Sequence, residues 1–210
     1  GKELELYMTH PWAPGAPFWL PKGTILWNIL ADYMRDVVKS AGFTEVRSPL
    51  VYNQKLWETS GHWFHYRENM FEIHSGDEVM GMKAMNCPGH MLMFGAEKRS
   101  YRELPIRFHD QSVLHRNEAS GVLSGLTRVR QFSQDDGHIF ITPDQIASEV
   151  ESALRLVKKV YGDFGLKIEM KLSTRPAEFL GEIAQWDNAE AQLRAALDAA
   201  KQEYTVNAGD

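Results

Sequence analysis

Apolar residues recur at helical spacing in several stretches of the chain. The longest stretch covers residues 25–40, where the spacing i, i+3, i+4 predicts a helix with Thr24 as its N-cap. A second helix is predicted after residues 142–145, Thr-Pro-Asp-Gln, which have the composition of a capping box with proline in the first turn. Shorter helices are predicted over residues 88–98 and 188–204.

Between these helices, short stretches alternate between apolar and polar residues, as strands do. The predicted strands cover residues 44–51, 78–85, 106–115, 126–134 and 166–172. The third and fourth flank a polar loop rich in glycine and serine, so we expect them to form a long antiparallel hairpin. Helices and strands do not alternate strictly, which argues against a doubly wound parallel sheet. The sequence therefore predicts an α+β fold with a mixed, largely antiparallel sheet and flanking helices.

One predicted strand has a face that does not suit a hydrophobic core. In steps of two, this face would present two cations, an aromatic ring, an amide, a carboxylate and an imidazole: Arg128, Arg130, Phe132, Gln134, Asp136 and His138. Such a combination of side chains indicates a binding site.

The single cysteine, Cys87, lies in a second polar stretch of the sequence. A lone cysteine cannot form a disulfide within its own chain, so two interpretations remain open. It is either a buried, inert thiol, which is the commoner case, or a reactive or metal-binding thiolate. One cysteine also fits a reducing compartment, most simply the cytoplasm.

Composition limits the class of protein. The chain has 210 residues, of which 43% are hydrophobic and 24% charged, as in an ordinary globular domain. Its net charge of −5 argues against a protein whose whole surface binds a nucleic-acid phosphate backbone. A local stripe of basic residues is compatible with this charge. No apolar run approaches the roughly 18 residues that a membrane span needs, so no membrane partner is expected.

Four motifs together resemble the threonyl-tRNA synthetases, which are class II aminoacyl-tRNA synthetases with a zinc ion in the amino-acid pocket. They are Met-Asn-Cys-Pro-Gly-His at residues 85–90, His-Arg-Asn-Glu at 115–118, Arg-Val-Arg at 128–130 and Gln-Asp-Asp-Gly-His at 134–138. The resemblance extends over most of the chain, from residue 4 to residue 176. It implies the catalytic fold of class II synthetases.

The resemblance implies a nucleotide site around the second motif. Arg116 would hold the α-phosphate of ATP and act in catalysis, and Glu118 would bind the adenine amino group. Phe132 would stack on adenine, and Arg128 would belong to the same ATP site, with Mg²⁺ bound to the nucleotide. Outside the family context, Arg116 is more often a surface ion pair and Phe132 more often a core residue.

The resemblance also implies an amino-acid pocket and a group for the transfer step. Cys87 and His138 match two of the three protein ligands of the family's zinc ion. Gln134, Asp136 and Met85 would contact threonine. His62 matches a histidine near the terminal ribose of the tRNA and would assist proton transfer.

Several larger expectations follow from the resemblance. The expected function is threonine–tRNA ligase, with threonine, ATP and tRNA(Thr) as substrates and a homodimer formed through residues 25–50. The chain would be the N-terminal two-thirds of a catalytic domain, with the third zinc ligand and the third class II motif beyond residue 210 and no editing or anticodon-binding domain. Two alternatives remain: a non-catalytic fragment or paralogue that acts as a ligand-binding or assembly module, and a synthetase for another amino acid.

Overall fold

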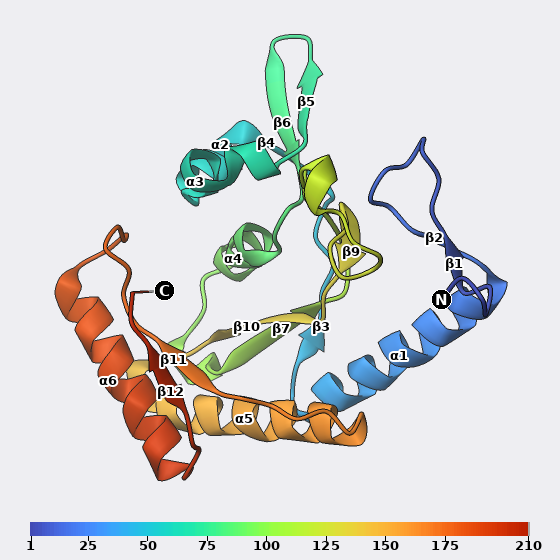
Figure 1. The fold of residues 1–210 in the computed structure, drawn as a ribbon. Coiled ribbons are helices and arrows are strands. Elements are labelled where there is room, and N and C mark those ends of the chain that lie inside the picture. Colours follow the sequence, from blue (N-terminus) through green and yellow to red (C-terminus); the bar gives the residue numbers. More distant parts are fainter. Residues whose placement is uncertain (210) are drawn as a thin grey trace. The chain divides into compact units, whose positions relative to one another are not determined.

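The computed structural model describes residues 1–209, which divide into two compact units. The first comprises Gly1–Arg99 and Arg107–His138, and the second comprises Ser100–Ile106 and the chain from Ile139 onward. The boundaries between the units fall inside two strands, β7 (Ile106–Asp110) and β10 (Asp136–Phe140). Figure 1 gives the order of the elements along the chain.

The first unit opens with a small antiparallel pair, β1 (Tyr7–Met8) and β2 (Phe18–Trp19), followed by the long helix α1 (Pro21–Ser40), blue in Figure 1. The predicted helix is confirmed, but its predicted start is wrong. Pro21 occupies the first turn, where its missing N–H costs nothing. Thr24 therefore lies inside the helix, and its backbone N–H donates to Leu20 O at 2.8 Å.

An antiparallel sheet and two short helices enclose the main apolar cluster of the first unit. The sheet has the order β4-β6-β5, and its elements and neighbours are β4 (Val51–Asn53), α2 (Gln54–Thr59), α3 (His62–Tyr66), η1 (Arg67–Asn69), β5 (Glu72–Ser75) and β6 (Glu78–Met82). The β5–β6 hairpin projects at the top of Figure 1. The buried members of the cluster are Trp57, Trp63, Met70 and Ala84.

The elements that carry the motifs follow in the same unit. They are α4 (Cys87–Gly95), β7, β8 (Val113–His115), η3 (Ser120–Val122), β9 (Gln131–Ser133) and β10. Strand β7 pairs in parallel with β3 (Thr44–Glu45) in a sheet of order β10-β7-β3. Strands β8 and β9 pair antiparallel, which confirms the predicted hairpin in its central part.

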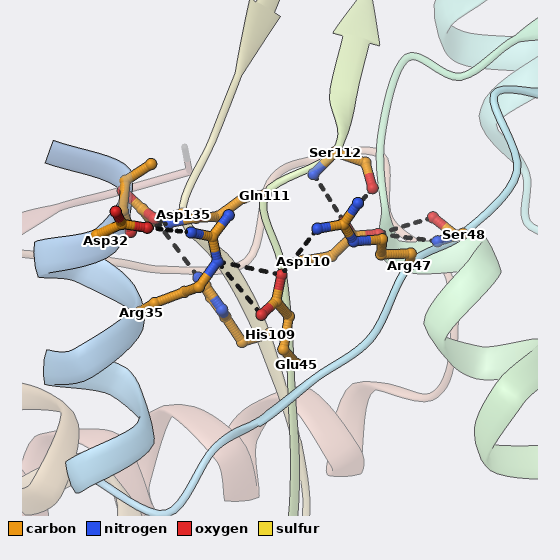
Figure 2. Close-up of polar contacts among 11 residues, drawn as sticks. Asp32, Arg35, Glu45, Arg47, Ser48, His109, Asp110, Gln111, Ser112 and Asp135 are labelled. Atoms are coloured by element: carbon orange, nitrogen blue, oxygen red, sulfur yellow. Dashed lines mark hydrogen bonds and ion pairs between the residues drawn. The ribbon is translucent and has the colours of Figure 1, made fainter. Parts of the chain in front are cut away.

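The two strands of that hairpin are shorter than predicted. The strand predicted over 106–115 breaks after Asp110, because the Asp110 side chain accepts the Ser112 backbone N–H at 2.7 Å and turns the chain. The strand predicted over 126–134 is reduced to β9, and Gln134 and Asp135 interrupt the path to β10. The Gln111 side chain donates to Asp135 Oδ1 at 2.5 Å, which joins the two breaks (Figure 2).

The second unit is built on two helices that contact each other, α5 (Ile146–Asp163) and α6 (Ile183–Ala199). Its other elements are η2 (Tyr101–Glu103), η4 (Pro143–Gln145), and the parallel pair β11 (Lys171–Ser173) and β12 (Thr205–Asn207). The predicted capping box is present, since the Thr142 N–H donates to Gln145 Oε1 at 3.0 Å. It caps the 3-10 turn that leads into α5.

The predicted fold class is confirmed. Four of the described pairings, β1–β2, β4–β6, β5–β6 and β8–β9, are antiparallel, while β3–β7 and β11–β12 are parallel. Across residues 1–209, no helix combines the length and apolar character that spanning a membrane requires.

Candidate active site

The N-terminal half of α4 lies against the first residues of β10. The Asn86 side chain donates to Asp136 Oδ2 at 3.1 Å, and His90 Nδ1 lies 2.8 Å from His138 Nδ1. Four residues along a helix advance by about 6 Å and two residues along a strand by about 6.8 Å. The two spacings match, so the i, i+4 pair of the helix contacts the i, i+2 pair of the strand.

Cys87 is the first residue of α4 and is partly buried, with no disulfide partner. Burial and the Asp136 carboxylate raise the pKa of its thiol, and the Arg116 guanidinium opposes this shift only in part. The thiol is therefore protonated at neutral pH unless a cation binds the sulfur. A metal ion that binds Cys87 must displace this proton.

Burial lowers the pKa of His138, and the neighbouring His90 lowers it further, while the Asp136 carboxylate opposes the shift. The ring is therefore neutral at physiological pH, which is the form of imidazole that binds metals. A thiolate and an imidazole suit zinc. Within residues 1–209, no group of three or more histidine, cysteine or acidic side chains could by itself hold a metal ion. The donor chemistry fits zinc, but these two donors form only part of a coordination shell.

A fully buried charged pair lies behind α4. Lys83 Nζ is 3.6 Å from Asp110 Oδ2, and both side chains are completely inaccessible to solvent. Ser48 joins them: it donates to Asp110 through its backbone N–H at 3.2 Å and its hydroxyl at 2.9 Å, and accepts from Lys83 at 3.0 Å. Figure 2 shows Ser48 and Ser112 beside Asp110. Burial would raise the pKa of Asp110, but the nearby His90 ring and the hydrogen bonds from Ser112 and Ser48 outweigh burial and hold it well below its usual value.

The residues expected to bind ATP meet on the β8–β9 pair. Strand register places Leu114 opposite Phe132, and the Arg116 N–H donates to Arg130 O at 2.9 Å. The Arg116 guanidinium carbon lies 5.1 Å from the centre of the Phe132 ring, which is a cation–π distance, and its Nε donates to Ala84 O at 3.4 Å. The structure thus brings Arg116 and Phe132 together.

Glu118 and Arg128 form an ion pair with 3.2 Å between Oε2 and Nε. The Glu118 side chain is only 16% exposed, whereas that of Arg128 is 59% exposed. Arg130 secures the loop between β8 and β9 from the other side, because its Nε donates to the Glu118 carbonyl at 2.8 Å and its Nη2 donates to Ser120 Oγ at 3.3 Å. Glu118 is thus held in place while Arg128 reaches into solvent.

The remaining predicted site residues are more dispersed. His62 Nδ1 is 2.8 Å from Ser60 Oγ, and burial together with the nearby His65 lowers its pKa. Met85 packs against the apolar cluster around Trp57, and Gln134 is exposed.

The prediction that residues 128–138 form one strand with a continuous polar face is wrong. Arg128 and Arg130 precede β9, and the break at Gln134 separates Phe132 from β10. Asp136 and His138 do share one strand, β10, at alternate positions.

Sequence reasoning missed four residues of the site: Lys83, Asn86, His90 and Asp110. Asn86, the N-cap of α4, and His90, in its first turn, are four residues apart and lie on either side of Cys87 in the sequence, a spacing that could have indicated a shared face. Lys83 directly follows β6 and Asp110 ends β7, and burial of such charged side chains is decided only by tertiary packing.

Residues 69–205 match the family described as tRNA synthetase class II core domain (G, H, P, S and T). This match covers more than half of the chain, which therefore belongs to the class II tRNA synthetase core-domain family and, within it, to the threonyl-tRNA synthetases.

The similarity to individual proteins extends over the whole chain. The cytoplasmic threonine–tRNA ligase of Saccharomyces cerevisiae is 52% identical over 210 residues, which are 100% of this chain and 29% of the relative. The threonine–tRNA ligase of Anaeromyxobacter dehalogenans strain 2CP-1 is 51% identical over 220 residues, covering 100% of this chain and 34% of the relative. The chain thus spans about a third of the length of the curated relatives it matches.

The fold agrees with a solved structure described as the RNA binding domain of threonyl-tRNA synthetase from Cryptosporidium parvum Iowa II. That structure is 48% identical, with a TM-score of 0.94, and the match covers 100% of this chain and 53% of that chain. The resemblance found in the sequence is therefore confirmed at the level of family and fold.

Proposed function

We propose that this chain is the catalytic core of a threonine–tRNA ligase, which activates threonine with ATP and transfers it to the 3′ end of tRNA(Thr). The observation that carries the proposal is the contact of α4 with β10, where the Asn86 side chain donates to Asp136 Oδ2 at 3.1 Å and His90 Nδ1 lies 2.8 Å from His138 Nδ1. Asp136 and Arg116 also act in opposite directions on the pKa of the Cys87 thiol, so a polar amino-acid pocket and a phosphate-binding arginine would lie close together. The names of the relatives supply the reaction.

In the activation step, a threonine carboxylate oxygen attacks the α-phosphorus of ATP and forms a new O–P bond. The bond between the α-phosphorus and the bridging oxygen breaks, and pyrophosphate leaves with that oxygen and the electron pair. Charge builds on the α-phosphate oxygens as the bond forms. The Arg116 guanidinium offers fixed N–H donors to these oxygens and so stabilises the transition state. Phe132 supplies the ring on which adenine stacks, and Glu118 accepts a hydrogen bond from the adenine amino group. Arg128 contributes positive charge to the same site, and Mg²⁺ accompanies the phosphates.

In the amino-acid pocket, Cys87 and His138 would hold zinc, which when bound acts as a Lewis acid for the amino and hydroxyl groups of threonine. Asp136, fixed by Asn86 at 3.1 Å, accepts hydrogen bonds from the same substrate groups. Gln134 and Met85 complete the pocket. Valine has the same shape as threonine but lacks the hydroxyl, so it would leave these polar groups unpaired, and a pocket of this kind rejects it strongly.

In the transfer step, the terminal ribose hydroxyl of the tRNA attacks the carbonyl carbon of the adenylate, and AMP leaves. His62 is neutral at physiological pH because its pKa is lowered by burial and by His65. It can therefore accept a proton from the ribose hydroxyl. Ser60, 2.8 Å from its Nδ1, orients the ring.

The proposed assembly is a homodimer in the cytoplasm. Helix α1 presents a row of exposed apolar side chains at helical spacing, which supports an interface through residues 25–50: Ile25, Leu26, Ile29 and Leu30. Sedimentation of the native full-length protein tests this assignment, and a monomer at micromolar concentration would contradict it. The cytoplasmic location is supported by the names of relatives and by the single cysteine.

Amino-acid-dependent exchange of pyrophosphate into ATP tests the function. The native full-length protein should exchange with threonine and at least about 10²-fold less well with valine. Cys87→Ser should lose zinc and threonine-dependent exchange, whereas Met91→Leu, an exposed position on the same helix, should change neither. Binding of ATP and threonine without any exchange would instead identify a non-catalytic module. Equal exchange with another amino acid would identify a different synthetase.

A further inference from the structure

His90 is completely buried between two polar partners. Its Nδ1 lies 2.8 Å from His138 Nδ1, and the two rings are nearly perpendicular, at 88°, with centroids 4.7 Å apart. On its other side, His90 Nε2 faces Asp110 Oδ2 at 3.7 Å. The three side chains form a continuous line from the buried carboxylate to the proposed zinc ligand.

The chemistry of two facing ring nitrogens determines where the protons are. Two Nδ1 atoms at 2.8 Å can form a hydrogen bond only if one of them carries the proton and the other offers its lone pair. A lone pair on His90 Nε2 would face the Asp110 carboxylate and be repelled, so the Nε2 of His90 carries a proton. With a neutral His90 ring, His90 Nδ1 is then the acceptor, and His138 Nδ1 carries the shared proton.

We propose that His90 is a positioning residue that fixes His138 as the Nδ1–H tautomer, so that the Nε2 lone pair of His138 is available to a zinc ion. This inference rests on the proposed zinc site. The opposite tautomer would place a proton on Nε2 of His138 and block coordination through that atom. Residues that bind metal through one ring nitrogen commonly donate the other N–H to a fixed acceptor, and here the acceptor is another histidine.

Asp110 fixes the orientation of His90, because the Asp110 carboxylate is itself held by other buried groups. Ser48 and Ser112 both donate to its carboxylate, and Lys83 lies 3.6 Å from it. The carboxylate therefore cannot rotate away from His90 without breaking several hydrogen bonds. An apolar side chain would fill the space occupied by His90 at lower desolvation cost, which favours a chemical role for the imidazole over simple packing.

Zinc affinity in the native full-length protein tests the role of His90 through two substitutions. His90→Leu keeps an apolar volume but offers no acceptor, and zinc affinity measured by competition with a chelator should fall about 10- to 100-fold. His90→Asn places an amide oxygen near the position of Nδ1 and should keep the affinity within a few fold. The visible spectrum of the cobalt-substituted protein should be altered by His90→Leu and preserved by His90→Asn, since it reports ligand geometry.

Further variants separate this inference from the proposed function. If Cys87→Ser retains full zinc affinity, the proposed zinc site itself is wrong. If Cys87→Ser loses zinc but His90→Leu binds it like the wild type, only the role of His90 is overturned. If His90→Leu does not fold, His90→Asn is compared with His90→Gln, whose longer amide reaches the position of Nε2 rather than Nδ1. Equal zinc affinities and cobalt spectra for these two variants would overturn the proposal.

Discussion

The two halves of the candidate site are held in place by different means. The face formed by α4 and β10 rests on side chains with no solvent access, of which Lys83, His90 and Asp110 are the charged or titratable members. The face formed by β8, β9 and their connecting loop rests on backbone pairing and on side chains that reach solvent, such as Arg128. The first half is positioned before any ligand arrives, whereas the second keeps a partly exposed charged rim.

The difference has a physical reason. A pocket that must recognise one hydroxyl group needs donors and acceptors fixed to within a fraction of an ångström, and a buried, fully bonded polar network supplies this rigidity. A nucleotide brings several charges and a large aromatic ring, so it can be bound by groups that adjust as it enters. Four measurements test this contrast.

The largest expected effect is on stability and comes from the buried pair. Lys83→Met would leave the Asp110 carboxylate buried without its cation, so we expect a loss of about 3–5 kcal/mol in the free energy of unfolding. Chemical denaturation of Lys83→Met beside Lys98→Met, at an exposed position, measures this loss. A change below about 1 kcal/mol would show that the α4–β10 face does not depend on the buried network.

The next effect is on catalysis and comes from the nucleotide half. Arg116→Ala should slow adenylate formation by about 10²- to 10³-fold, the range for removal of one donor to a transition state. Its thermal unfolding should change little, because the backbone pairing that carries Arg116 remains. Pyrophosphate exchange and circular dichroism give the two readouts, with the exposed Arg155→Ala as the matched control. Unfolding of Arg116→Ala would assign the residue a structural role.

A smaller effect is expected on the stability of the folded chain at acidic pH. The pKa of Asp110 in the folded chain is held below its usual value by its hydrogen bonds, so the folded state binds this proton less readily than the unfolded state. Its contribution to stability is therefore complete above about pH 4 and is lost as the pH falls through the lowered pKa. Denaturation of wild type and Asp110→Asn between neutral and acidic pH should show their stability difference shrinking towards low pH. A stability difference that stays constant with pH would contradict the assignment of this acid dependence to Asp110.

The smallest expected effect on stability is at the rim. The Glu118–Arg128 ion pair is 3.2 Å long, but the arginine is 59% exposed, and such pairs contribute less than about 1 kcal/mol. Arg128→Ala should therefore unfold almost like the wild type while its KM for ATP rises several fold. Steady-state exchange kinetics at varied ATP, combined with thermal unfolding, check both. A large loss of stability would erase the contrast between the two halves of the site.

The sequence by itself determined the helices with clear apolar periodicity and the residues of the four motifs. The helix predicted over residues 25–40 lies within α1, and the capping box at Thr142 is present. These features depend on neighbours within a few positions of the chain. The strand lengths were overestimated because two side-chain contacts that the alternating pattern does not show break the strands. One is the local hydrogen bond from the Ser112 N–H to Asp110, and the other joins Gln111 to Asp135, 24 residues away.

Only the tertiary structure decided which motif residues meet. Nothing in the spacing of Cys87 and His138 shows that His90 contacts His138. Nor does it show that Lys83 and Asp110 are buried beside His90. Burial is a property of the packed chain, and the pKa values of Asp110, Cys87 and His138 depend on it. The local pattern of the sequence therefore supplied the chemical groups of the site, and long-range packing set their partners and charge states.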